Sequence, residues 1–395
     1  MRDSERWLLP EGVEEILPPE AERLEALRRR VLDRLQAWGY EMVVPPFVEH
    51  LEALLTGMGR DLDLQTFKLT DPKSGRQLGV RADMTPQVAR IDAHRLRRDA
   101  PTRLCYIGTV LHTHAAMPGG SRSPLQLGAE LYGHAGVESD AEVICLMSDI
   151  LTLAGVRPLC LDIGHIGIFR GLARKAGLDA DREMELFSLL QRKAAPEIAE
   201  SARAWRLAAP LRDRLLALTR LNGGSAVLNE SRQRLRGAGA EVARALEDLR
   251  RIAHLLKRRL PGVALHFDLA ELRGYHYHTG VMFAAYHPGE GQALAWGGRY
   301  DNVGRVFGRA RAATGFSLDL LRLLRRQPPG RPTAVRRILA PSTPADAALH
   351  ETIAALRRRG MRVIMDLPGK RGNAGAPGCT HRLVRSRGGW RVVRL

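Results

Sequence analysis

The chain has 395 residues, 45% of them hydrophobic, and a formal net charge of +18 at neutral pH. This length fits two domains with ordinary packed cores. It contains no run of eighteen apolar residues, no signal-peptide pattern and no Cys-x-x-Cys pair. We therefore expect no membrane span, no disulfide framework and no cysteine zinc site, as in a cytoplasmic protein.

The positive charge has two interpretations. A strong basic excess is typical of nucleic-acid binders. Only six of the 61 basic residues are lysine, however, which indicates a general bias toward arginine, and the arginines are scattered along the predicted helices. We expect a solvated basic surface and no nucleic-acid partner, while anionic small substrates and an acidic partner protein stay open.

The first part of the chain mixes helix and strand patterns. Helices are predicted over residues 20–38 and 139–154, and strands over 39–46, 66–81 (a hairpin), 103–114 and 125–133. Thr85 and Pro86 have the positions of a helix cap and a first turn. Gly39 supplies the end of the first helix, and two prolines end the strand that follows it.

The second part contains a helical block and a small terminal unit. Residues 166–258 have a helical pattern without a strand signal, which indicates an inserted subdomain. Strands are predicted over 263–286, a strand that runs into a helix over 313–322, and a βαβ unit over 335–367. The tail 368–395 is rich in glycine and arginine, and its order stays open. The pattern predicts an antiparallel α+β core over residues 1–326 and a small α/β unit over 333–395.

One predicted strand, Leu125–Tyr132, alternates apolar and polar positions. Gln126, Gly128, Glu130 and Tyr132 share a face, because side chains alternate along a strand. A carboxylate and an amide separated by a glycine can hold an imidazole or an ammonium group. By itself, the strand fits a sheet with a solvated polar face better than a binding site.

Two further segments carry groups that suit a small zwitterion. Asp83 can receive an ammonium group with help from Thr85, although such a pair also serves as a plain turn and cap. Arg273 can pair with a carboxylate or a phosphate. His276 and His278 are predicted to share a strand face, but no third ligand has diagnostic spacing. We therefore expect no metal and favour the packing of aromatic strand residues.

The segments Arg273–Gly280 and Gly297–Asp301 resemble the two histidine-specific signatures of histidyl-tRNA synthetases. The resemblance covers about residues 8–326, including the helical insertion. It implies a class II aminoacyl-tRNA synthetase-like antiparallel sheet, followed by a shortened anticodon-binding domain. Gly39–Pro46 resembles the first class II motif, which implies a homodimer interface.

The resemblance also implies a binding site for histidine. The implied ligand-binding residues are Asp83, Thr85, Gln126, Glu130, Arg273, Tyr277 and His278. Asp83 replaces the glutamate that is usual in the family, and His278 replaces a tyrosine.

The resemblance breaks on the ATP side. In Leu111–His114, the positions that hold an arginine and a glutamate in the second class II motif are His112 and His114. A mostly neutral imidazole lacks the permanently charged fork of arginine, and losing one such donor costs about 3–4 kcal/mol. In the third motif, Asp319 replaces a glycine and is expected to place negative charge near ATP, and Leu321 replaces an acidic residue.

A retained amino-acid pocket beside a lost activation site is similar to the paralogues of histidyl-tRNA synthetase that serve as regulatory subunits of ATP phosphoribosyltransferase. The resemblance implies a subunit without catalytic residues or cofactors. It implies a homodimer that assembles with the short catalytic subunit, enables its activity in the first step of histidine biosynthesis, and takes part in feedback inhibition by free L-histidine. Two alternatives stay open: an active or degenerate histidyl-tRNA synthetase, and a non-catalytic tRNA-binding module.

Overall fold

The computed structural model describes residues 7–56, 60–115, 120–275, 277–328, 337–343, 345–367 and 378–395. The chain divides into two compact units, residues 1–326 and 327–395. The helices are α1 (Glu20–Ala37), α2 (Leu51–Leu55), α3 (Arg60–Gln65), α4 (Thr85–Arg90), α5 (Val137–Leu153), α6 (Ile166–Lys175), α7 (Ala180–Gln191), α8 (Ala195–Ala204), α9 (Ala209–Leu218), α10 (Val227–Arg234), α11 (Ala240–Arg259), α12 (Leu320–Arg326) and α13 (Ala347–Arg358), with a π-helical turn (Ile91–Leu96) and a 3-10 turn (Arg305–Phe307). The strands are β1 (Glu41–Met42), β2 (Val48–His50), β3 (Lys68–Thr70), β4 (Gln77–Val80), β5 (Thr102–Thr109), β6 (Leu125–Tyr132), β7 (Cys160–His165), β8 (Asn222–Gly223), β9 (Ala264–Asp268), β10 (Val281–Tyr286), β11 (Ala295–Arg299), β12 (Ala313–Asp319), β13 (Arg337–Ala340), β14 (Arg362–Met365), β15 (His381–Ser386) and β16 (Gly389–Arg394).

A nine-stranded sheet forms the centre of the first unit, in the order β1-β5-β6-β12-β11-β10-β7-β9-β8. The central strands from β5 to β7 are all antiparallel neighbours. The two parallel pairs, β1 with β5 and β7 with β9, lie toward the edges. The predicted α+β class with an antiparallel core is therefore confirmed. A separate three-stranded sheet, β2-β4-β3, contains the predicted hairpin.

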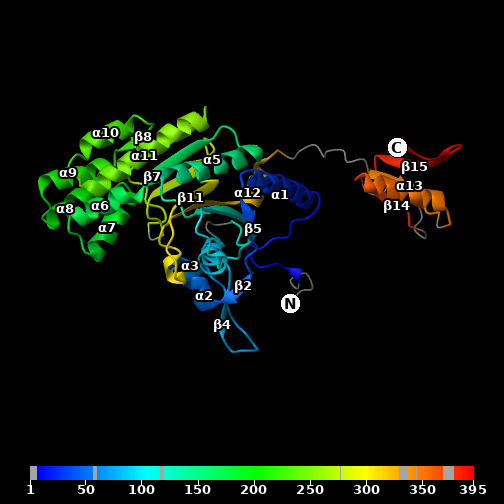
Figure 1. Cartoon of the computed structure of the whole chain (residues 1–395), viewed down its shortest axis with the longest axis horizontal. Coiled ribbons are helices and arrows are strands. Elements are labelled where there is room, and N and C mark those ends of the chain that lie inside the picture. The colour runs from blue at the N-terminus through cyan, green and yellow to red at the C-terminus, as the bar shows by residue number, and fades with distance from the viewer. Residues whose placement is uncertain are drawn as a thin grey trace. The chain divides into compact units, whose positions relative to one another are not determined.

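The main helical layer covers one face of the large sheet (Figure 1). Helix α5 packs on β6, β10, β11 and β12, and α11 packs on α5 and β7. The apolar side of β6, with Leu127, Ala129 and Leu131, joins this core. On the opposite face, Tyr106 and Tyr300 belong to a second, smaller core under α4. The polar residues of β6 alternate with the leucines and therefore lie on this second face.

The helices α6 to α10 gather at one end of the sheet, drawn in green in Figure 1. Helix α11 joins them to the sheet because its buried side chains recur every three or four residues, as in Val242, Leu246 and Leu249. Helix α6 packs along α11, and α7, α8 and α9 follow one another in contact. Within this block the two-residue strand β8 pairs with β9, although the sequence pattern contained no strand signal there.

Two local predictions are wrong. Helix α4 begins at Thr85 itself, and the Thr85 hydroxyl contacts Tyr106 instead of capping an amide. The segment before β10 forms turns, with Gly274 in the left-handed region at φ +68°, so His278 is not on a strand. His276 lies outside the described residues.

The second unit contains a four-stranded sheet, β14-β13-β15-β16. The parallel pair β13 and β14 with α13 between them forms the predicted βαβ unit. The hairpin of β15 and β16 adds an ordered half that the glycine- and arginine-rich composition did not reveal. Among the residues that the structure describes, no helix has the length and apolarity needed to cross a bilayer.

Candidate functional site

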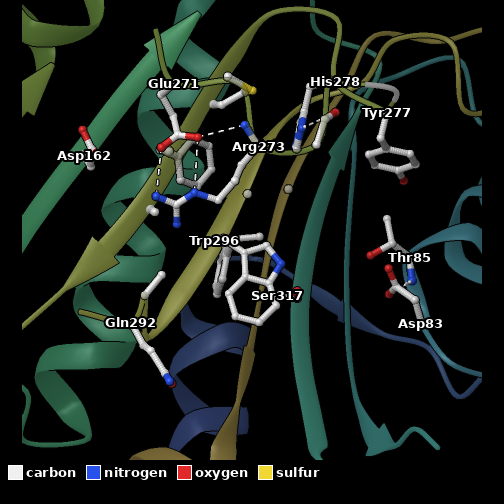
Figure 2. A pocket seen from close by; sticks show the side chains of 18 of the residues that line it. Asp83, Thr85, Asp162, Glu271, Arg273, Tyr277, His278, Gln292, Trp296 and Ser317 are labelled. Carbon is white, nitrogen blue, oxygen red and sulfur yellow. Dashed lines mark hydrogen bonds and ion pairs between the residues drawn. The ribbon is translucent and has the colours of Figure 1, made fainter. Parts of the chain in front are cut away.

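A cavity of about 900 Å³ opens on the sheet face opposite α5. Figure 2 shows Asp83 and Thr85 on one side of it, near the ring of Tyr277, and Glu271 on the other side, with Trp296 between them. We call the part around Asp83, Thr85 and Tyr277 the inner end, and the part around Glu271 and Trp296 the outer end. The volume is in the range of small-molecule sites.

The carboxyl group of Glu130 lies at the inner end and is almost completely buried. The Tyr106 hydroxyl donates a hydrogen bond to Glu130 Oε1 at 3.0 Å, and the Thr85 hydroxyl is 2.8 Å from that of Tyr106. Glu130 Oε2 has no hydrogen-bond partner among the described residues. Burial raises the pKa of Glu130 well above its ordinary value. A buried polar atom without a partner is costly, and a ligand that bonds to it removes the cost.

Two tyrosine hydroxyls near Glu130 are likewise buried without a hydrogen-bond partner among the described residues. Tyr277 and Tyr300 stack with ring centroids 4.9 Å apart, and neither hydroxyl has a hydrogen-bond partner within the described part of the chain. Both residues line the cavity. The inner end therefore offers a carboxyl group and two hydroxyls to a ligand that both donates and accepts hydrogen bonds.

Asp83 is held in place by its neighbours. Its Oδ1 accepts hydrogen bonds from the Thr85 amide at 2.9 Å and from Gln126 Nε2 at 2.8 Å. The Gln126 Oε1 accepts from the Met84 amide at 3.0 Å. Gln126 thus positions Asp83 and does not itself line the cavity. These contacts leave Asp83 Oδ2 available to an ammonium group.

Glycines create the hollow of the inner end. A Cβ atom at Gly315, the strand partner of Glu130, would lie 1.7 Å from Glu130 Oε2 and 2.3 Å from the Tyr300 hydroxyl. A Cβ atom at Gly128 would lie 2.2 Å from the Tyr106 ring. The space that the ligand needs therefore depends on residues without side chains on β6 and β12.

The segment before β10 supplies Arg273 and His278. Arg273 is held by Glu271, whose carboxylate accepts from Nη2 at 2.8 Å and from Nε at 3.2 Å. His278 Nδ1 is 3.1 Å from the Gly274 carbonyl, which fixes this nitrogen as the donor. Burial lowers the pKa of His278 to about 4, so the ring is neutral at pH 7.

Known proteins are similar to this chain over its whole length. Residues 12–323 match the family model of histidyl-tRNA synthetases, and residues 335–393 match the C-terminal domain of the ATP phosphoribosyltransferase subunit HisZ. Proteins called ATP phosphoribosyltransferase regulatory subunit are 59% identical in Thioalkalivibrio sulfidiphilus and 54% identical in Pseudomonas aeruginosa, with full coverage of both chains. The chain belongs to the family of ATP phosphoribosyltransferase regulatory subunits.

Solved structures agree with this assignment. The crystal structure of an ATP phosphoribosyltransferase regulatory subunit/histidyl-tRNA synthetase from Bacillus halodurans is 28% identical, with a TM-score of 0.81 over 93% of this chain and 94% of that one. A histidyl-tRNA synthetase from Nostoc sp. PCC 7120 has a TM-score of 0.78 at 16% identity, over 98% and 97% of the two chains, and shows the shared fold alone. The C-terminal match separates the regulatory-subunit family from the synthetases.

In the present chain, the residues at the expected ATP-binding positions form hydrogen bonds within the protein. His112 Nε2 is 2.9 Å from the Ala82 carbonyl, and His114 is exposed, with Nδ1 3.0 Å from the Thr113 hydroxyl. Asp319 Oδ1 accepts from the Leu321 amide at 3.0 Å. Neither the two histidines nor Asp319 and Leu321 line the cavity. The expectation that Asp319 places negative charge near ATP stays a prediction.

The structure brings together most of the predicted site. Asp83, Thr85, Glu130, Arg273, Tyr277 and His278 line one cavity, and Gln126 lies behind Asp83. The face of β6 that carries Gln126 and Glu130 is buried in the fold and is not solvated. Sequence reasoning did not name Tyr106, Tyr300 or Gly315 as site residues, although Tyr300 lies within the Gly297–Asp301 segment. The glycines were the available signal, since a strand glycine often marks a close approach of another group.

Proposed function

We propose that this chain is the non-catalytic regulatory subunit of ATP phosphoribosyltransferase. In this function it assembles with the short catalytic subunit, is required for that subunit's activity, and contributes to feedback control by histidine in the first step of histidine biosynthesis. The observation that carries the proposal is the inner end of the cavity, where Glu130 and two tyrosines have buried polar atoms without partners among the described residues. Family membership supports the choice of partner enzyme.

Free L-histidine is the proposed ligand of the inner end. Its imidazole carries one donor and one acceptor, which suits the Glu130 carboxyl group and the hydroxyls of Tyr277 and Tyr300. Its ammonium group suits Asp83 and Thr85, and its carboxylate suits Arg273. His278 contributes a neutral ring to the wall of the site.

We propose further that the chain does not form histidyl-adenylate. Adenylation needs fixed positive charge at the phosphorus that is attacked. His112 is engaged by a backbone carbonyl outside the cavity, and Arg322 Nη1 donates to the Ala293 carbonyl at 2.8 Å. Detectable histidine-dependent exchange of pyrophosphate into ATP would contradict this part of the proposal.

The segment around β1 is the proposed homodimer interface. Three of its apolar side chains are exposed, namely Met42 at 43%, Val44 at 78% and Phe47 at 45%. Neighbouring exposed apolar side chains of this size mark an interaction surface. Light scattering at micromolar concentration, without the catalytic subunit, is expected to give a dimer, and a monomer would contradict the interface.

Reconstitution tests the whole function. The short catalytic subunit is assayed for phosphoribosyl transfer to ATP with and without this chain, and with histidine added to the complex. We expect activity only with both chains and inhibition by histidine. A catalytic subunit that neither binds this chain nor gains activity from it would overturn the proposal.

A further inference from the structure

The positive charge of the chain is concentrated in the second unit. Residues 327–395 contain 14 basic and three acidic residues, a formal charge of +11. The first 326 residues, with 47 basic and 40 acidic residues, carry only +7. The sequence-based expectation of an even basic surface is therefore wrong for this unit, and a net charge this large on 69 residues selects anionic partners.

The sheet of the second unit has two different faces. Helix α13 covers one face, where Ile338, Val363 and Leu383 pack against Leu349 and Ile353 in a small core. The other face carries alternate positions of all four strands: Leu339, Ile364, Val384, Val393, Arg337, Arg362, Arg382 and Arg391. We call this set the arginine face. Among the described residues of the second unit, no helix packs on it.

The cross-strand register shows how the arginine face is arranged. Leu339 on β13 lies opposite Ile364 on β14, and Val393 on β16 lies opposite Arg382 on β15. Ile364 is 37% exposed, and Arg382 and Arg391 are exposed. Aliphatic side chains therefore share the face with arginine side chains on every strand.

This composition favours an acidic protein surface over the other anionic partners. Protein interfaces combine an apolar centre with a polar rim and are enriched in arginine. Sequence-tolerant nucleic-acid surfaces stack bases on aromatic side chains. No described aromatic residue belongs to the arginine face, because Trp390 lies on the α13 side, where it bonds to Asp346. A second copy of the same face would meet like charge, which opposes self-association.

We propose that the arginine face is a docking surface for an acidic, partly aliphatic surface of the ATP phosphoribosyltransferase catalytic subunit. The choice of partner rests on the proposed function. The arginines steer the encounter and fix the register, since rim charges act mainly on the association rate and its salt dependence. Ile364 and its aliphatic neighbours supply the contact that is buried in the complex.

The test compares charge reversals on the two faces of the second unit in the full chain. The double variant Arg382→Glu/Arg391→Glu changes the arginine face. Arg394→Glu is the matched control, because Arg394 is exposed on the same strand as Arg391 but alternates onto the α13 side. Binding to the catalytic subunit is measured by interferometry at 50 and 300 mM NaCl. Binding to bulk tRNA and poly(U) is measured at the same salt concentrations.

We expect the double variant to bind the catalytic subunit about tenfold more weakly at 50 mM NaCl, through slower association and with a smaller salt dependence. Arg394→Glu should stay within about twofold of the unaltered chain. Ile364→Ser, which leaves the charge unchanged, should instead speed dissociation. Equal melting temperatures of the variants exclude misfolding as the cause.

The other results have distinct meanings. If the arginine-face variants bind the catalytic subunit as the unaltered chain does, the docking proposal is overturned while the proposed function stands. If only RNA binding falls in the double variant, the face is a nucleic-acid surface and the docking proposal is again overturned. If the unaltered chain does not bind the catalytic subunit at all, the proposed function fails and this proposal fails with it.

Discussion

The two ends of the cavity differ in how their polar groups are satisfied. At the inner end, Glu130 Oε2 and the hydroxyls of Tyr277 and Tyr300 are buried without partners in the described chain. At the outer end, Arg273 is held by Glu271, and Arg322 donates to a backbone carbonyl. The cations of the outer end therefore already have partners within the chain, whereas these polar atoms of the inner end have none among the described residues.

The strongest test of this difference fills the inner end. Gly315→Ala places a methyl group where Glu130 Oε2 and the Tyr300 hydroxyl already lie. We expect histidine binding, measured by calorimetry, to fall more than about 100-fold, since overpacking alone costs about 1–3 kcal/mol and the ligand contacts are lost as well. Gly291→Ala is the matched control, because Gly291 lines the cavity and a Cβ atom there meets nothing within 4 Å. Equal losses in the two variants would sink the assignment of the ligand to the inner end.

Removing the carboxyl group should have the next largest effect. Glu130→Ala is expected to weaken histidine binding by about 2–5 kcal/mol, because a buried charged or polar contact is worth more than a contact at the rim. Histidine inhibition of the assembled enzyme should weaken in parallel, while assembly itself stays intact. Unchanged affinity would mean that this pocket is a relic and that histidine acts elsewhere, most simply on the catalytic subunit.

The outer end should respond less. Arg273→Ala is expected to weaken histidine binding by about 1–2 kcal/mol, since Arg273 already has a carboxylate partner that competes with the ligand. Glu271→Gln serves as the control, because it releases Arg273 and should leave binding equal or tighter. A larger loss for Arg273→Ala than for Glu130→Ala would reverse the ranking of the two ends.

The raised pKa of Glu130 predicts that the stability of the folded chain depends on pH. Burial raises the pKa of Glu130, so the folded chain binds a proton that the unfolded chain releases above about pH 4.5. The contribution of Glu130 to stability is therefore present below the unfolded pKa and is lost as pH rises. Glu130→Gln should melt higher than the unaltered chain at pH 8, by about 2 °C for each kcal/mol gained, and the gap should close toward pH 5. Melting curves at several pH values check this, and a gap that is independent of pH would refute it.

The smallest expected effect is on the ATP side. His112→Arg should give no histidine-dependent pyrophosphate exchange, because the restored guanidinium would stand without the other groups of the activation site. An exchange rate above background would show that the groups needed for ATP activation are nearly complete. It would contradict the view that only the inner end of the cavity can still bind its ligand.

Much of the fold followed from the sequence, because its long elements have clear periods. The alternation over Leu125–Tyr132 appears as expected, and so does the strand that runs into a helix over 313–322, although the helix continues to Arg326. The hairpin of β15 and β16 was missed because arginine and glycine obscure its alternation. The segment before β10 was read as a strand because it is rich in tyrosine and histidine, whereas Gly274 at φ +68° turns the chain there.

The site was only partly predictable for a similar reason. Asp83, Glu130 and Arg273 were found through their resemblance to known segments. Tyr106 and Tyr300 reach the site across the sheet, and a sequence does not show which strands become neighbours. The internal bonds of Arg273 and His112 also depend on residues distant in space, so no local pattern could have shown that these groups are already engaged.

The glycines that create the hollow of the inner end, Gly128 and Gly315, have a genetic consequence. A single added methyl group at Gly315 reaches the carboxyl group of Glu130 and the Tyr300 hydroxyl. Gly→Ala changes need one nucleotide substitution, and the added methyl group contacts groups of the inner end. A selection for histidine overproduction should therefore recover small-to-large replacements on β6 and β12 that abolish feedback while the enzyme complex stays active.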